Sequence, residues 1–99
     1  MSKLVRDRIP EIIEHANKIP ITHIAGDEEY AKKLKLKLQE EIAEFLESES
    51  EEELADVLEV VYSICDLKGI NRDEIEEIRK KKAEERGGFE ERIVLDEVR

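Results

Sequence analysis

Two groups of acidic residues in the middle of the chain have types and spacing suited to binding a metal ion. The first is Glu40-Glu41-Ile42-Ala43-Glu44, and the second is Glu53-Leu54-Ala55-Asp56. In each group two acids stand three residues apart, which places them on neighbouring parts of one helix face. Carboxylates in this arrangement can hold a hard divalent cation such as Mg²⁺, which commonly binds substrate phosphates as well.

The negative charge of the chain is concentrated around these acids. The 99 residues carry a net charge of −10. Between Glu40 and Leu67 there are eleven acids and no Lys or Arg, so the remainder of the chain is nearly neutral. Like charges at this density repel one another. Because no base lies within the segment, we expect solvation, protonation or a bound cation to offset the repulsion.

Periodicity places some of these acids toward the interior. With about 100° per residue, Glu41 falls in the apolar stripe of its helix, and Glu53 falls in the wide apolar arc of the next one. Glu44 and Asp56 stand at the edges of those stripes. An unpaired buried carboxylate costs several kcal/mol, which favours a metal site. Periodicity alone leaves open that these acids cap and solvate the helices, since Glu53 also has a capping position.

The first half of the chain predicts two of the helices that position these groups. Pro10 suits a first helical position, and an apolar face continues to about Lys18. Residues 19–26 are predicted to form a loop. Asp27 is the expected N-cap of a long second helix over residues 28–48.

The second half predicts two more helices. Ser50 begins a capping box and a third helix, which ends at Gly69. Asn71 begins a fourth helix that runs to about Arg86, and the tail from 89 to 98 is expected to be extended. The short break between the second and third helices makes them antiparallel neighbours. We therefore expect a single all-α domain over residues 1–99, an antiparallel bundle of about four helices with a short extended tail.

Composition argues against several functional classes. The acidic charge disfavours binding to nucleic acid, and no stretch approaches the roughly 18 apolar residues of a membrane span. The N-terminus has no signal-peptide pattern, so we expect a cytoplasmic protein. The single Cys65 cannot form an intramolecular disulfide and is expected to be a buried apolar residue. A di-iron bundle would need Glu-x-x-His pairs, which the sequence lacks.

The acidic motif resembles the metal-binding signature of the all-α NTP pyrophosphatases, the superfamily of MazG, dimeric dUTPases and phosphoribosyl-ATP pyrophosphohydrolases. The segments 3–13 and 82–95 are similar to the two ends of a small MazG-like subgroup of predicted house-cleaning enzymes. This resemblance implies that Glu41, Glu44, Glu53 and Asp56 hold Mg²⁺, with Mn²⁺ as an alternative. It also implies cleavage of NTP to NMP and pyrophosphate by a homodimer or homotetramer, often with the site completed by a neighbouring subunit.

A nucleotide substrate also needs a base for water and cations for phosphate. Glu40, or a ligand such as Glu41, is expected to orient or deprotonate the attacking water. The cations expected to contact phosphate are Arg6, Lys33, Lys37, Lys82 and Arg86. Two alternatives remain open at this point. One is a phosphoribosyl-ATP-type substrate, and the other is a helical interaction module without catalysis.

Overall fold

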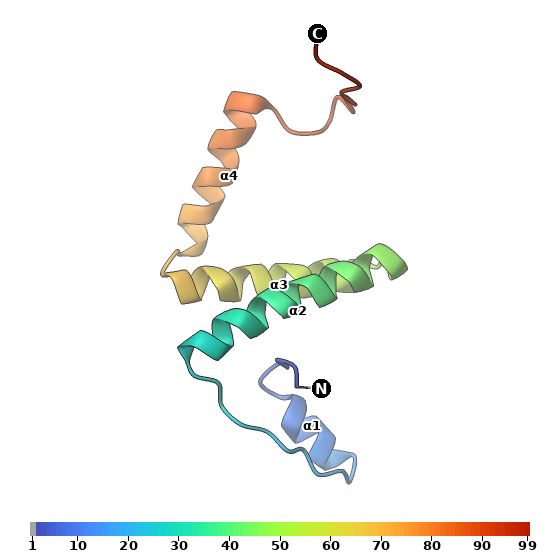
Figure 1. The fold of residues 1–99 in the computed structure, drawn as a ribbon, viewed down its shortest axis with the longest axis vertical. Helices are drawn as coiled ribbons and strands as arrows, with labels where there is room; N and C mark the ends of the chain where they lie inside the picture. Colours follow the sequence, from blue (N-terminus) through green and yellow to red (C-terminus); the bar gives the residue numbers. More distant parts are fainter. Residues whose placement is uncertain (1) are drawn as a thin grey trace.

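The computed structural model describes residues 2–99, and over that range the chain forms four α-helices and no β-strand. The helices are α1 (Ile9–His15), α2 (Asp27–Ser48), α3 (Glu51–Lys68) and α4 (Arg72–Arg86) (Figure 1). The all-α fold class predicted from the sequence is therefore confirmed. The tail after α4 is exposed and contains one turn near Phe89, without regular structure beyond it.

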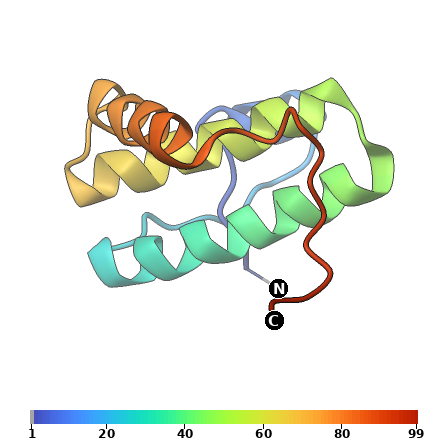
Figure 2. The ribbon, with the colours of Figure 1, turned by 90° about the horizontal axis from the view of Figure 1, so that it is seen from above.

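The centre of the molecule is the antiparallel hairpin of α2 and α3, which lie side by side in both views (Figures 1 and 2). Only two residues connect them. Glu49 closes α2 in a left-handed conformation with φ of 55°, and its N–H donates to the carbonyl of Phe45. Ser50 then begins α3, where its hydroxyl accepts a hydrogen bond from the N–H of Glu53. The capping predicted for α3 is thus confirmed.

The other helix ends agree with the sequence in part. Gly69 ends α3 with φ of 73°, and Asn71 caps α4 by accepting from the N–H of Glu74. The predicted N-cap of α2 was wrong, because Gly26 holds that position and Asp27 is the first helical residue. The first helix also ends at His15, three residues earlier than predicted. A left-handed Asn17, with φ of 61°, turns the chain there.

The N-terminal segment and α4 lie on opposite sides of the hairpin (Figure 1). Among the helices of the described chain, α4 contacts only α3, where the guanidinium of Arg72 lies 4.1 Å above the ring of Tyr62. The molecule is consequently elongated, with extents of 60 × 31 × 24 Å. The hairpin has one side that faces the N-terminal segment and another from which α4 rises.

The buried core is small. Among the described residues, the buried apolar side chains are Leu34, Val60 and Cys65, so the prediction for the cysteine is confirmed. The one buried charged residue in that part of the chain is Glu41, which is 6% exposed. Because Glu41 is buried, its charge must be neutralised by groups that lie close to it.

Candidate metal centre

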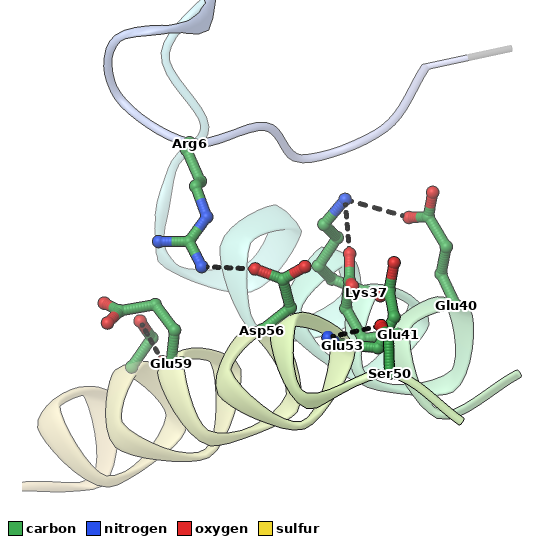
Figure 3. Close-up of polar contacts among 9 residues, drawn as sticks. Arg6, Lys37, Glu40, Glu41, Ser50, Glu53, Asp56 and Glu59 are labelled. Atoms are coloured by element: carbon green, nitrogen blue, oxygen red, sulfur yellow. Dashed lines mark hydrogen bonds and ion pairs between the residues drawn. The ribbon is translucent and has the colours of Figure 1, made fainter. Parts of the chain in front are cut away.

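Three of the expected carboxylates meet on the side of the hairpin that faces the N-terminal segment. Glu41 comes from α2, and Glu53 and Asp56 come from α3 (Figure 3). One oxygen of each lies within 4.8 Å of the others. The antiparallel pairing brings the two acidic motifs together, because Glu41 precedes the turn by about two helical turns and Glu53 follows it directly.

Glu41 is buried and only partly paired. Its Oε1 lies 3.2 Å from the ammonium of Lys37, one turn earlier on α2. Its Oε2 is inaccessible and has no hydrogen-bond partner. An ionised oxygen without a partner in a buried position is costly, so this atom is a candidate ligand for a cation.

Glu53 has the same unmet requirement. Its Oε2 is also inaccessible and without a hydrogen-bond partner. The loss of solvent contact, the nearby Glu41 carboxylate and the charge of Glu44 raise the pKa of Glu53 from 4.5 to about 7. Desolvation and neighbouring negative charge both disfavour a second carboxylate in this position. A divalent cation would relieve both effects.

Basic side chains pair with the cluster, which corrects the expectation that no base would do so. The ammonium of Lys37 lies 3.1 Å from Glu40 as well as 3.2 Å from Glu41. Arg6 donates a hydrogen bond of 2.7 Å to Asp56. The expectation was drawn from the segment between Glu40 and Leu67 alone. Lys37 lies one turn before that segment, and Arg6 reaches the cluster only because the N-terminal segment folds back across the hairpin.

These two bases also line a cavity of about 450 Å³ next to the cluster. The N-terminal segment forms one wall and the hairpin forms the other. Apolar groups on its walls include Leu4, Ile9 and Val60, and Tyr30 adds an aromatic ring. The charged groups are Arg6, Asp7, Arg8, Lys37, Glu41, Asp56 and Glu59. A cavity lined by apolar, acidic and basic side chains can bind an anionic organic molecule if a cation bridges the carboxylates and the anion.

The remaining predicted site residues lie at differing distances from the cluster. Glu44 is not one of the three acids whose oxygens gather, although its carboxylate is close enough to raise the pKa of Glu53. Lys33 donates a hydrogen bond of 3.0 Å to the backbone carbonyl of Ser2, so it holds the N-terminal segment. Lys82 and Arg86 are exposed on α4 and do not line the cavity. Within one chain, the fold therefore brings Arg6 and Lys37 to the acids but not the bases of α4.

Two residues near the cluster were not predicted. Lys3 lies 3.3 Å from Glu40 and so ties the N-terminal segment to α2. Glu59 lines the cavity one turn after Asp56. Its spacing of three residues from Asp56 was a usable signal, because it continues the acidic face of α3. No local pattern pointed to Lys3, since its contact depends on the path of the N-terminal segment.

The carboxylates of Glu41, Glu53 and Asp56 fit a hard divalent ion in their chemistry and in their spacing. Mg²⁺ binds oxygen ligands at about 2.0–2.1 Å, so opposite ligands lie about 4.2 Å apart. Separations of up to 4.8 Å among the three carboxylate oxygens are close to that distance, and small side-chain movements would close the difference. Two of the three acids offer buried oxygens that lack a partner.

Comparison with known proteins supplies no family. No family model matches the chain, and no solved structure matches it. A stretch of 44 residues is 48% identical to an uncharacterized protein of Mycolicibacterium smegmatis. That stretch is 44% of this chain and 45% of the length of the relative. Within residues 2–99, none of the helices has both the length and the apolar character needed to cross a bilayer. Functional inference therefore depends on the site itself.

Proposed function

We propose that this protein is a Mg²⁺-dependent nucleoside triphosphate pyrophosphohydrolase that converts NTP to NMP and pyrophosphate. The observation that carries the proposal is the meeting of Glu41, Glu53 and Asp56 beside a cavity lined by bases. Buried carboxylate oxygens without partners favour a metal, and basic groups next to them favour a phosphate ligand. The resemblance of the acidic motif to the all-α NTP pyrophosphatases supports the same reaction class.

The acids of the hairpin would hold the ion. Glu41, Glu53 and Asp56 are the first candidates, and Glu44, whose side chain acts on Glu53, is the next. When bound, Mg²⁺, or Mn²⁺ in its place, would neutralise triphosphate charge and lower the pKa of an attacking water. The hairpin supplies these ligands from two adjacent helices, so their spacing is fixed by the packing of α2 on α3.

Arg6 and Lys37 are the side chains best placed to contact phosphate. Both line the cavity, and each is paired with a carboxylate that would otherwise face the ion. With a metal ion on those carboxylates, Arg6 and Lys37 would be available to bind phosphate oxygens, and the guanidinium of Arg6 could bind them in a bidentate way. Lys33 stabilises the N-terminal wall through Ser2. Lys82 and Arg86 would contribute only from another copy of the chain.

The proposed reaction is attack of water on the α-phosphorus. A P–O bond forms to the water oxygen, the bond to the bridging α–β oxygen breaks, and pyrophosphate leaves. The proton of the water needs an acceptor. Hydrogen bonds from Lys37 and Lys3 outweigh partial burial and lower the pKa of Glu40, so Glu40 is suited to orient water and is a weak base. Glu41 remains the alternative among the predicted catalytic residues.

The proposal extends to substrate and assembly. We infer a modified or non-standard nucleotide as substrate, a cytoplasmic location, and a homodimer or homotetramer. Phosphoribosyl-ATP is the closest alternative substrate, because it offers the same triphosphate-type anhydride to the same cluster. A helical interaction module without catalysis is the alternative from another class, and the exposed apolar side chains of the hairpin favour it.

Screening nucleotides for pyrophosphate release in the presence of Mg²⁺ tests the proposal. The panel should contain standard NTPs, modified NTPs and phosphoribosyl-ATP. Glu41→Gln, Glu53→Gln and Asp56→Asn are each expected to lower turnover more than about a hundredfold. Glu47→Gln and Glu52→Gln are matched controls, since both acids are exposed on the same two helices. Unchanged turnover in any two of the cluster variants would contradict the assignment, and no release from any nucleotide would favour the interaction module.

A further inference from the structure

The chain before α2 is only lightly attached to the hairpin. We call residues 2–25 the N-terminal arm; it consists of α1 with an irregular stretch on either side. Within the described chain, α1 packs against no other helix, and the backbone hydrogen bonds of the arm stay inside the arm. Leu4, Val5 and Ile9 are half-buried, but they line the cavity instead of filling a core. Polar side chains must therefore contribute much of the attachment.

Three polar contacts tie the arm to the hairpin in the part of the chain that the structure describes. They join Lys3 to Glu40 at 3.3 Å, Arg6 to Asp56 at 2.7 Å, and the carbonyl of Ser2 to the ammonium of Lys33 at 3.0 Å. Two of the three contacts thus end on carboxylates of the acidic motifs, and Figure 3 shows Arg6 reaching down to its partner. Ion pairs between exposed or half-exposed side chains are individually weak, so a competing cation can displace them.

The contact of Arg6 competes directly with a metal ion. Asp56 is one of the three acids whose oxygens gather in the cluster, and its Oδ1 already accepts a hydrogen bond from Arg6. A divalent ion bound to Asp56 would place two positive charges close to the guanidinium. Like charges at such short range repel one another. Metal binding therefore weakens this attachment of the arm.

The contact of Lys3 is weakened by a second route, because its partner is shared. Glu40 lies 3.1 Å from Lys37 as well as 3.3 Å from Lys3, and Lys37 also lies 3.2 Å from Glu41. An ion on Glu41 would take over the neutralisation of that acid and leave Lys37 to pair with Glu40 alone. Lys3 is the more exposed of the two bases, at 62% against 17%. It is therefore the base that Glu40 loses more readily.

We propose that binding of a divalent ion to the carboxylate cluster releases the N-terminal arm and opens the cavity. Without the ion, Arg6 and Lys3 serve as counter-ions of the acids, and the arm lies across the site. With the ion, these bases lose their partners and the wall formed by the arm moves away, which admits an anionic substrate. The ion shifts this equilibrium because it binds more tightly when Arg6 no longer competes for Asp56. The inference rests on the metal site of the proposed function but not on hydrolysis.

Distances between two spin labels in the full chain test the release. The labels are attached at Glu14→Cys on α1 and Glu47→Cys on α2, since both positions are exposed. The native Cys65 is buried and gives the same background in all samples. We expect a narrow distance distribution without metal and a broader one with longer distances at saturating Mg²⁺. Labels at Glu47→Cys and Lys68→Cys, both within the hairpin, should keep their distribution.

Arg6→Gln and a salt control separate release by a bound ion from general screening. Arg6→Gln should broaden the distribution without any metal, because it removes the contact with Asp56. Arg8→Gln is the matched control: it removes the same charge from the same segment, but Arg8 pairs with Glu11 inside the arm at 3.2 Å. NaCl at the ionic strength of the Mg²⁺ solution should broaden the distribution much less than Mg²⁺ does.

Three results would overturn the proposal. They are an unchanged distribution at saturating Mg²⁺, equal broadening by NaCl and Mg²⁺, and equal broadening in Arg6→Gln and Arg8→Gln. The outcome is also separable from that of the proposed function. Mg²⁺-dependent pyrophosphate release with an arm that stays in place refutes the release of the arm alone. An arm released by Mg²⁺ in a protein that turns over no nucleotide refutes the hydrolysis and supports the present inference.

Discussion

Arg6 and Asp56 are fifty positions apart in the sequence, and Nη2 of Arg6 donates a hydrogen bond of 2.7 Å to Oδ1 of Asp56. This contact joins the N-terminal segment to α3, and both residues line the cavity. The hydrogen bond to Asp56 raises the pKa of Arg6, although burial opposes it slightly. A permanent positive charge thus lies at the edge of the carboxylate cluster, where it competes with any cation that Asp56 would bind.

Replacing Arg6 by Gln should strengthen Mg²⁺ binding and weaken substrate binding. Removing one positive charge near the cluster is expected to lower the Mg²⁺ dissociation constant about three- to tenfold. The loss of stability should stay within about 1 kcal/mol, because the side chain of Arg6 is 56% exposed and that of Asp56 is 35% exposed. Calorimetric titration of the protein with Mg²⁺ measures the dissociation constant, and urea unfolding measures the loss of stability.

Arg79→Gln is the matched control for that experiment. Arg79 pairs with Glu76 at 2.6 Å on α4 and does not line the cavity. Its replacement should leave the Mg²⁺ dissociation constant unchanged. If Arg6→Gln weakened Mg²⁺ binding, the inferred competition for Asp56 would be wrong.

Replacing Lys37 by Met should destabilise the metal-free protein by about 2 kcal/mol, because it leaves the buried Glu41 without a cation. Burial lowers the pKa of Lys37, but hydrogen bonds to Glu40 and Glu41 outweigh it, so the net pKa is raised. The stabilisation is therefore fully present below the ordinary pKa of 10.5. It is lost only as the pH rises through the higher folded value. Urea unfolding at pH 7 measures the difference.

Lys32→Met provides the comparison for Lys37→Met. Lys32 lies 3.7 Å from Glu28, and both side chains are exposed, so its loss should cost less than about 0.5 kcal/mol. The result that would count against the burial argument is an equal loss in the two variants. Adding Mg²⁺ should restore much of the stability of Lys37→Met, since the ion takes over the neutralisation of Glu41.

The helices could be predicted from local signals, whereas the pairing of Arg6 with Asp56 could not. Ser50, Gly69 and Asn71 act within three or four residues of themselves, so their hydrogen bonds are visible in the sequence. The N-cap of α2 was misassigned because Asp27 is a strong capping residue type next to Gly26, and only the backbone conformation separates the two.

Periodicity placed Glu41 and Glu53 toward the interior, because they interrupt apolar stripes, but it left open whether these acids bind a metal or only cap and solvate the helices. The partners of the acids did not follow from periodicity. The contact of Arg6 with Asp56 depends on how the segment before α1 returns across the hairpin, which no local pattern encodes. The pairing of Lys37 with Glu41 was predictable from the sequence, since the two residues are four positions apart on one helix face.

The stability of the metal-free protein should fall as the pH rises from about 4.5 to about 7. Loss of solvent contact, the nearby Glu41 carboxylate and the charge of Glu44 raise the pKa of Glu53 to about 7. The folded state then binds a proton that the unfolded state has already released, so raising the pH favours unfolding in this window. Thermal unfolding followed by circular dichroism across this range measures the effect.

Glu53→Gln should flatten that part of the pH profile, because the amide cannot ionise. Glu52→Gln should leave it unchanged, since Glu52 is exposed on the first turn of the same helix. A profile of Glu53→Gln that parallels the unaltered protein would show that another group causes the pH dependence.

Mg²⁺ should raise the melting temperature in proportion to the logarithm of its concentration. Binding to the folded state alone stabilises it by about 2.7 kcal/mol at one hundred times the dissociation constant. For a chain of 99 residues this corresponds to a shift of about 10 °C or more. Glu41→Gln and Asp56→Asn should abolish the shift, because each removes one of the three gathered ligands.

The control variants decide whether such a shift comes from this cluster. The hairpin holds eleven acids between Glu40 and Leu67, and a diffuse cloud of Mg²⁺ would also reduce their repulsion. Diffuse screening would act alike on Glu47→Gln and Asp56→Asn, since each removes one negative charge from the hairpin. A bound ion would distinguish them, because only Asp56 shares the 4.8 Å cluster. Equal Mg²⁺ shifts in the two variants would therefore exclude a specific metal centre here, whatever the size of the shift.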